Sequence, residues 1–207
     1  MNKFPIHPDG RFLTIPGSID SYYNCDYTGM GNAGNPDFLN HLKNQFNRTN
    51  VVELQNNQSI LCDVLQIDLN LIKGIYSNIN LTICVVPRAK EESFYSTDQK
   101  LFRQTVSNVV NTVGGYSDGT NYILRHTNTR TTHLDRSGYG GDGDLPYPGI
   151  TKDTCNISNA VRGKDILLID DIYTAGIYID EDAIQALFDN GVKNVYFYAV
   201  GKTVMGL

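Results

Sequence analysis

The amino-acid sequence predicts an α/β protein built on a parallel sheet. Two short apolar runs, Leu81–Val86 and Ile166–Ile169, have the length and continuity of strands that are buried on both faces. The second run is followed by a helical pattern and then by another apolar stretch at Asn194–Val200. Because the connections in this strand–helix–strand unit are short, we expect a right-handed parallel crossover.

Length and composition favour one globular domain and argue against several functional classes. The chain has 207 residues, of which 41% are hydrophobic and 19% charged, and a formal net charge of -5. This charge argues against a protein that coats nucleic acid. The four cysteines are scattered without a C-x-x-C pair, so a zinc ribbon or a thioredoxin-like site is not indicated. The N-terminus lacks the apolar region of a signal peptide, and no run is long enough to cross a membrane, so we expect a soluble cytoplasmic protein.

The first third of the chain predicts helices after an irregular beginning. Residues 1–35 are rich in Gly, Asn, Pro and Tyr, and they predict loops and short strands. Apolar residues then recur at helical spacing over 36–47, with Pro36 at the first helical position. The apolar stretch that follows is compatible with helix or strand, and we favour a helix over 59–75.

The middle of the chain predicts a helix, a strand and a long glycine-rich segment. Asp98 can cap a helix that runs to Val113, where a Gly-Gly pair ends it. A strand is predicted over Asn121–Leu124. Residues 126–150 contain five glycines and few apolar residues. A segment of this length without periodicity is typical of a functional flap or a disordered loop.

The last third predicts a strand over Asp165–Asp170 and a helix over Ile177–Asn190, which Gly191 ends. Three acidic residues at 180–182 lie in the first turn of this helix, where they complement the positive end of its dipole.

The segment Ile166–Tyr178 combines three features that suit a sugar phosphate. The acidic pair Asp170 and Asp171 follows the apolar strand, at the end where open α/β sheets bind ligands. A turn of small residues at Thr174–Gly176 then leads into a helix, so that backbone N–H groups can approach a phosphate. Carboxylates accept hydrogen bonds from vicinal hydroxyls, whereas they would repel a phosphate at contact distance.

This run resembles the motif by which type I phosphoribosyltransferases, including the orotate and competence-associated members, bind 5-phosphoribosyl-1-pyrophosphate (PRPP). That motif is an apolar stretch followed by acidic-acidic-x-x-Thr-x-Gly. The resemblance is specific over 160–203, including the ending Gly201-Lys202-Thr203, and extends back to residue 81 in outline. It implies a Rossmann-like parallel sheet, with residues 76–207 as the phosphoribosyltransferase core and 1–75 as a small N-terminal hood that is not independent.

The resemblance also implies residue roles. Asp170 and Asp171 would hold the ribose 2′ and 3′ hydroxyls, directly or around Mg²⁺. Tyr178 departs from the family, whose members commonly have Thr, Ser or Ala there, although its backbone N–H can still serve a phosphate. The residues expected to contact PRPP are Asp170, Asp171, Tyr173, Thr174, Ala175, Gly176, Ile177 and Tyr178.

Two further segments resemble the family in position. Arg88, Ala89 and Lys90 follow the strand that ends at Val86, and they are candidates for a pyrophosphate loop. The alternative is a solvated basic turn. The glycine-rich segment resembles the flexible catalytic loop, and any of its basic residues is either a group that closes over pyrophosphate or a surface residue. These residues are Arg125, Arg130, His133 and Arg136, with Arg130 our catalytic candidate.

The implied function is an Mg²⁺-dependent enzyme that transfers phosphoribose from PRPP to a nitrogenous acceptor and releases pyrophosphate. Asp170, Asp171 and Arg130 are its expected catalytic residues, and the sequence does not indicate the acceptor. One alternative is a regulatory or binding module that keeps the PRPP pocket without turnover. Another is a competence-associated partner protein, although the usual cysteine pairs are missing. A Walker B strand is disfavoured because no G-x-x-x-x-G-K-[ST] motif is present. Dimers are common in the family, so a homodimer is also expected.

Overall fold

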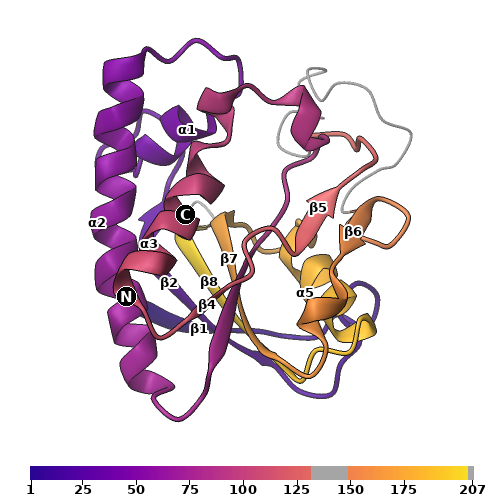
Figure 1. Ribbon diagram of the computed structural model, residues 1–207. Helices are drawn as coiled ribbons and strands as arrows, with labels where there is room; N and C mark the ends of the chain where they lie inside the picture. Colours follow the sequence, from indigo (N-terminus) through magenta and orange to yellow (C-terminus); the bar gives the residue numbers. More distant parts are fainter. Residues whose placement is uncertain (132–148, 205–207) are drawn as a thin grey trace.

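A computed structural model of the chain describes residues 1–131 and 149–204. Its central sheet has the strand order β1, β2, β8, β7, β3, β4 (Figure 1). The strands from β2 to β4 in this order run parallel, and β1 pairs antiparallel with β2 at one edge. The predicted α/β class with a mostly parallel sheet is therefore confirmed. The bounds are β1 Asn2–Ile6, β2 Ile19–Tyr27, β3 Leu81–Val85, β4 Ser117–Asp118, β7 Asp165–Tyr173 and β8 Asn194–Thr203.

Helices cover both faces of the sheet. Helices α1, α2 and α3 pack on one face and α5 on the other, as Figure 1 shows for α2 and α5. No helix in the described ranges is both long enough and apolar enough to span a bilayer. The bounds are α1 Phe38–Lys43, α2 Val51–Ile75, α3 Leu101–Val113 and α5 Ile179–Asp189, with short 3₁₀ segments at Glu92–Phe94, Thr97–Gln99 and Asn159–Val161.

The central strands divide their side chains between two cores. In β7, Leu167 and Ile169 pack on the α2 face, whereas Ile166 and Leu168 pack on the α5 face. This alternation follows from the period of two along a strand. Because both faces are covered, every residue of β3 is buried. The continuous apolar runs in the sequence are thus explained, and their prediction as doubly buried strands is confirmed.

Helix α2 begins eight residues before the predicted start at 59, and a local cap explains the difference. The side-chain oxygen of Asn50 accepts a hydrogen bond from the backbone N–H of Glu53 at 2.9 Å. A cap of this kind satisfies a backbone donor that the first turn of a helix leaves free. The stripe that packs on the sheet includes Leu61, Leu65, Leu69 and Ile72.

Other element ends differ from the prediction for similar local reasons. Asp98 does not cap α3. Ser96 instead forms a capping box with Gln99 in a 3₁₀ turn, and α3 starts after it without a side-chain cap. Helix α1 ends at Lys43 rather than at residue 47, because Asn44 adopts a left-handed conformation with φ 42°.

The strand predicted over Asn121–Leu124 lies outside the central sheet. It is observed as β5, Ile123–Arg125, and it pairs antiparallel with β6, Cys155–Ile157, in a separate two-stranded sheet. In the last third, β7 continues to Tyr173 and β8 to Thr203, beyond the predicted ends. Because of the extension, Asp171 as well as Asp170 lies within β7.

Residues 1–75, expected as a hood, contribute directly to the main structure. β2 lies beside β8 in the central sheet, and Tyr22 pairs in register with Tyr198. α1 and α2 cover one face of the same sheet. This integration was not predicted, because polar and apolar residues are mixed in β2.

The buried stripe of α2 should dominate its contribution to stability. Leu65 is 0% exposed and Leu71 is 49% exposed in the same helix. We expect Leu65→Ala to lower the free energy of unfolding by about 2–5 kcal/mol, because it removes apolar contacts and leaves a cavity. Leu71→Ala should cost less than about 1 kcal/mol. Urea unfolding measures both, and equal losses would contradict this packing.

Candidate functional site

A cavity of about 300 Å³ opens at the carboxyl ends of β7 and β3. Parallel strands bring these ends to the same edge of the sheet, which is the usual ligand edge of an open α/β sheet. The walls come from both sides of the sheet and carry charges of both signs. The charged residues of the described walls are Lys43, Arg88, Glu92, Lys100, Arg103, Asp170, Asp171 and Asp180.

The acidic pair of β7 extends to the two sides of the sheet. Asp170 and Asp171 are consecutive in an extended strand, so their side chains leave in opposite directions. Each is fixed by the next backbone N–H: Asp171 N–H donates to Oδ1 of Asp170, and Ile172 N–H donates to Oδ1 of Asp171, both at 2.8 Å. The site therefore has one carboxyl on the α1 side and one on the α5 side.

On the α1 side, Asp171 forms an ion pair with Lys43. The lysine Nζ lies 2.7 Å from Oδ2 of Asp171, and the side chains are 25% and 15% exposed. Burial by itself would lower the pKa of Lys43, yet the carboxylates of Asp171 and Asp170 raise it overall. Burial likewise acts to raise the pKa of Asp171, but Lys43 holds it below its ordinary value. Both groups are therefore charged at neutral pH.

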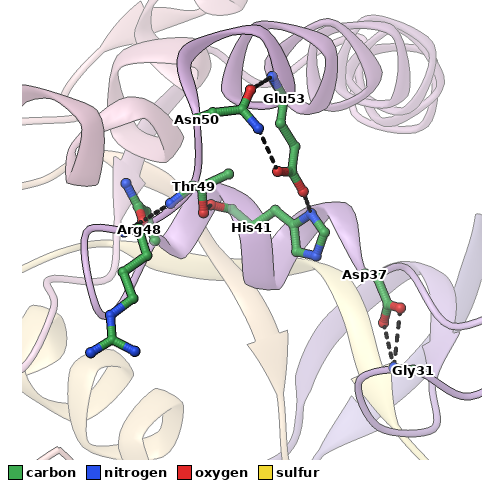
Figure 2. Close-up of polar contacts among 8 residues, drawn as sticks. Gly31, Asp37, His41, Arg48, Thr49, Asn50 and Glu53 are labelled. Atoms are coloured by element: carbon green, nitrogen blue, oxygen red, sulfur yellow. Dashed lines mark hydrogen bonds and ion pairs between the residues drawn. The ribbon is translucent and has the colours of Figure 1, made fainter.

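Lys43 reaches the acidic pair because α1 is held against the start of α2. Figure 2 shows His41 of α1 paired with Glu53, whose backbone N–H also bonds Asn50. The hydroxyl of Thr49 donates to the carbonyl of His41 at 3.4 Å. These contacts fix α1 near its last residue, so the lysine at its end points into the cavity.

On the α5 side, Asp170 meets Asp180, which lies in the first turn of α5 and is 3% exposed. Burial, followed by the neighbouring carboxyl of Asp170, raises the pKa of Asp180 well above its ordinary value. Burial and then Asp171 raise the pKa of Asp170 to about 7. The closeness of the two carboxyls disfavours a second negative charge on this side of the sheet.

The turn between β7 and α5 has the tight geometry that the sequence predicted. Ile177 N–H donates to the carbonyl of Thr174 at 3.2 Å, and Gly176 has φ 79°. A Cβ added at Gly176 would meet no atom within 4 Å, so the space beside it is open. Thr174 and Ile177 line the cavity, whereas Ala175 and Gly176 are exposed at the turn.

The two tyrosines of the motif point away from the cavity. Tyr178 has φ 64°, an uncommon value for a residue with a side chain, and its ring stacks on Phe12 at 4.9 Å between centroids. The Tyr173 hydroxyl donates to Oε1 of Glu181 at 2.9 Å inside the α5 core. Neither side chain is among the cavity walls. Direct contact of these rings with a ligand is therefore not supported by the structure.

Arg88 lines the cavity, but protein acceptors use most of its donors. Its guanidinium donates to the carbonyls of Lys43 at 2.9 Å and Gln99 at 2.6 Å. It also bonds Oε1 of Gln45 at 3.0 Å and stacks over the ring of Tyr95. Arg88 thus anchors the end of α1 to the loop after β3, while its charge still faces the cavity.

The rest of the predicted pyrophosphate loop is also tied to the protein. Ala89 lines the cavity, and its carbonyl accepts from the backbone N–H of Thr129 at 2.8 Å. Lys90 Nζ donates to the carbonyl of Thr129 at 2.8 Å and is not among the cavity walls. The loop is therefore braced against Thr129.

The basic candidates of the glycine-rich segment fall into three groups. Arg125 is buried and donates to the carbonyls of Arg88 at 2.6 Å and Gly149 at 2.9 Å, which indicates a structural role. Arg130 is exposed and is not among the cavity walls. His133 and Arg136 lie outside the described residues.

Lys43 and Asp180 are site residues that sequence reasoning did not identify. Lys43 lies in a segment that was correctly predicted as helical, but no local pattern shows which strand end a helix faces. Asp180 was interpreted as one of three acidic residues that complement a helix dipole, whereas the structure buries it beside Asp170. The only sign in the sequence was that Asp180 follows the acidic pair after a single turn, at the start of the next helix.

The described residues contain no group of three or more His, Cys, Asp or Glu side chains arranged to hold a metal ion. Asp170 and Asp171 nevertheless supply the hard oxygen ligands that Mg²⁺ prefers. Mg²⁺ is often bound by one or two carboxylates together with phosphates of a substrate, and the acidic pair fits that mode.

Comparison with known proteins does not assign the chain to a family: no protein-family model matches it, and no curated protein does. The cavity itself indicates which ligand chemistry the chain can accept. Carboxyls at one strand end, a glycine turn into a helix and surrounding cations together suit a ligand with both hydroxyl and anionic groups.

The raised pKa of Asp170 has a measurable consequence for stability. Between its ordinary value of 3.8 and about 7, the folded protein keeps a proton that the unfolded chain has lost. Stability is therefore lost as pH rises through this window. Asp170→Asn removes the titration and keeps an oxygen acceptor for Asp171 N–H. As the pH rises through this window, the free energy of unfolding of Asp170→Asn should increase relative to that of the native protein, by up to about 1.4 kcal/mol per pH unit.

Urea unfolding across that pH range tests this expectation. Asp165→Asn is the matched control, because Asp165 lies at the other end of β7 and bonds Asn194 and Lys193. A difference between Asp170→Asn and the native protein that stays constant with pH would contradict the assignment.

Proposed function

We propose that the chain binds PRPP in this cavity and transfers its phosphoribosyl group to a nitrogenous acceptor, with release of pyrophosphate. The observation that carries the proposal is the arrangement at the end of β7. An acidic pair is followed by a glycine turn into α5, and both lie along one cavity at the carboxyl edge of the parallel sheet. The resemblance of Ile166–Tyr178 to the PRPP-binding motif supplies the identity of the ligand.

The proposal includes a finer fold class, a Rossmann-like sheet of the type I phosphoribosyltransferase kind. Two observations support it. β7 lies at the centre of the parallel strands, and β3, whose loop carries Arg88, is its direct neighbour. Asp170 and Asp171, expected at the ribose, and Arg88 and Ala89, expected at the pyrophosphate, therefore line the same cavity.

Asp171 keeps the capacity to bind a hydroxyl although Lys43 is close. An ionised carboxylate has about four lone-pair sites. In Asp171, Lys43 Nζ uses one on Oδ2 and Ile172 N–H uses one on Oδ1. The remaining sites can accept from the vicinal hydroxyls of ribose, with Asp170 on the other side. The 5′-phosphate would then meet backbone N–H groups of the turn at 174–178, where that of Ile177 already donates to the carbonyl of Thr174.

Mg²⁺ fits this proposal as an ion carried by the pyrophosphate and held by Asp170 and Asp171. When bound, it would neutralise part of the charge of the leaving group. Lys43 and Arg88, the cations of the protein at the cavity, would also neutralise part of the charge of the leaving group.

The side chains of the site position the reactants rather than attack them. Displacement at ribose C1 passes through an oxocarbenium-like state, and carboxylates close to the ribose favour that positive charge. Walls from α1, α5 and the loop after β3 restrict water at the reacting centre. Thr174 does not provide a general base, since its hydroxyl bonds that of Thr203 at 2.7 Å. An acceptor that is already deprotonated, or ammonia, suits this chemistry best.

A regulatory or binding module without turnover is the second candidate. It is favoured by the orientation of Tyr178, which stacks on Phe12 and offers no hydroxyl to a phosphate. It is also favoured by Arg88, whose guanidinium already bonds three protein acceptors. Both candidates require the same pocket, and they differ only in whether pyrophosphate is released.

Binding of Mg-PRPP tests the pocket. We expect Asp171→Asn to weaken binding by about tenfold or more, because a charged hydrogen-bond acceptor for the ribose is lost. Binding of Mg-pyrophosphate alone should change less, since it has no hydroxyls and loses only the contact of Asp171 with the metal ion. Isothermal titration calorimetry measures both, with Asp165→Asn as the control on the same strand. Equal affinity of the native protein and Asp171→Asn for Mg-PRPP would exclude the assigned role.

Pyrophosphate release distinguishes the enzyme from the binding module. The native protein with Mg-PRPP should release pyrophosphate in the presence of at least one nitrogenous base, or of ammonia, from a broad panel. Asp171→Asn should lower the rate with that acceptor. Tight binding of Mg-PRPP without release for any member of the panel would favour the regulatory module.

A further inference from the structure

Tyr178 joins the phosphate turn, residues 174–178, to the start of α5. Its carbonyl accepts a hydrogen bond from the backbone N–H of Asp182 at 3.1 Å, which begins the hydrogen-bond ladder of α5. The backbone N–H groups of Ala175, Gly176 and Tyr178 itself have no acceptor among the described residues. Because φ and ψ are the only soft torsions of a residue's backbone, those of Tyr178 decide how these donors lie relative to the helix.

Tyr178 holds this position in a backbone conformation that a tyrosine disfavours. Its φ of 64° and ψ of 13° are left-handed. In that region a Cβ crowds a backbone carbonyl oxygen, whereas glycine makes no such contact. The other non-glycine residues with positive φ in the described part of the chain are Asn44 and Asn47, and asparagine tolerates this region. Tyr178 thus needs a stabilising contact that an asparagine or a glycine would not.

That contact comes from the loop between β1 and β2. The ring of Phe12 stacks on the ring of Tyr178, with 4.9 Å between the centroids and 24° between the planes. The guanidinium of Arg11 lies 4.7 Å from the centroid of the Phe12 ring. A stacked aromatic pair and a left-handed residue change the free energy by amounts of the same order and of opposite sign. The stack can therefore offset the backbone cost at Tyr178.

Phe12 is itself held in place by its own loop and by α5. Oδ1 of Asp9 accepts a hydrogen bond from the backbone N–H of Phe12 at 2.7 Å. Leu13 is buried in the core on the α5 side of the sheet. The backbone N–H of Thr14 donates to Oε1 of Gln185, a residue of α5, at 2.8 Å. The loop is thus attached to the helix that follows the phosphate turn, and this attachment fixes the Phe12 ring beside that turn.

We propose that Phe12 is a positioning residue of the phosphate turn, which stabilises the left-handed conformation of Tyr178 and so keeps the free N–H groups of the turn arranged for a 5′-phosphate. This inference rests on the proposed function and adds to it a determinant from the N-terminal segment. Without the stack, part of the unliganded protein leaves this conformation, and the apparent affinity falls with the fraction that remains competent to bind. The ring of Tyr178, where members of the resembled family commonly have Thr, Ser or Ala, thereby has a role as the stacking partner.

Substitutions of Phe12 test whether its ring acts on the phosphate turn. Phe12→Ala should bind Mg-PRPP about three- to tenfold more weakly than the native protein, whereas Phe12→Tyr, which keeps a ring, should bind within about twofold. Phe46→Ala is the matched control and should also bind within about twofold. Phe46 is another loop phenylalanine with a guanidinium, that of Arg48, 5.8 Å from its ring centroid, and it is not among the cavity walls.

Mg-pyrophosphate is the control ligand, because it has no 5′-phosphate to meet the turn. Isothermal titration calorimetry should give each of these variants the native affinity for it, which also shows that the variant is folded. An equal loss of affinity for Mg-PRPP and Mg-pyrophosphate in Phe12→Ala would overturn the inference, because the effect would not be confined to the turn.

A double-mutant cycle with Tyr178 separates the backbone effect from any other effect of Phe12. Tyr178→Ala keeps a Cβ and loses the stack, so it should bind Mg-PRPP about as weakly as Phe12→Ala. Tyr178→Gly removes the Cβ, so the left-handed conformation no longer depends on the stack. Adding Phe12→Ala to Tyr178→Gly should then change the affinity by less than about twofold. A further loss of the full size in that background would overturn the inference.

A measurement without ligand tests the conformation directly. Backbone NMR reports the φ of Tyr178 through the coupling between its amide and α protons. The native protein should show a left-handed value, and Phe12→Ala should show an average with other conformations. A native coupling in Phe12→Ala, or native affinity of Phe12→Ala for Mg-PRPP, would overturn the inference and leave the proposed function standing. Absence of Mg-PRPP binding by the native protein would overturn both.

Discussion

The balance of charge at the end of β7 is the constraint on which the rest of the site depends. Two consecutive carboxyls lie there in a largely buried setting, where an isolated charge is costly. The fold relieves that cost in two different ways. Asp171 is paired with a cation brought by α1, whereas burial raises the pKa of Asp170, which lies beside a second acid brought by α5, to about 7 and so reduces its charge. Each solution requires a helix on its own face of the sheet.

The period of a β-strand turns one acidic dipeptide into two separate environments. Consecutive side chains leave on opposite faces, so Asp170 and Asp171 meet different helices although they are neighbours in sequence. The pKa of Asp171 is lowered, so this carboxyl is ionised at neutral pH, whereas the pKa of Asp170 is raised to about 7. This asymmetry gives the cavity two distinct acceptors for a ligand with vicinal hydroxyls. It also explains why α1, through the His41–Glu53 contact with α2, matters to a site that is distant in sequence.

Elements defined by long apolar patterns were predictable, whereas their ends and partners were less so. β3 and the core of β7 follow from uninterrupted apolar runs. The start of α2 depends on Asn50 and the end of α1 on Asn44. Many other Asn residues of this chain could cap a helix equally well, so the sequence does not show which of them does so. β2 was obscured because it mixes polar and apolar residues, and only its register beside β8 shows it to be a sheet strand. Arg88 and Ala89 of the segment predicted as a pyrophosphate loop line the cavity, but the bonds that occupy Arg88 come from distant segments.

The sequence by itself determined the chemistry that is local to one stretch of chain: an apolar strand, the acidic pair that ends it, and a glycine turn into a helix. Those features depend on neighbours within a few residues, so the order of residues specifies them. The tertiary structure decided which charges face that strand end. Lys43 and Asp180 reach it because helices pack on opposite faces of the sheet. Packing of this kind is set by the whole core, and no local spacing in the sequence encodes it.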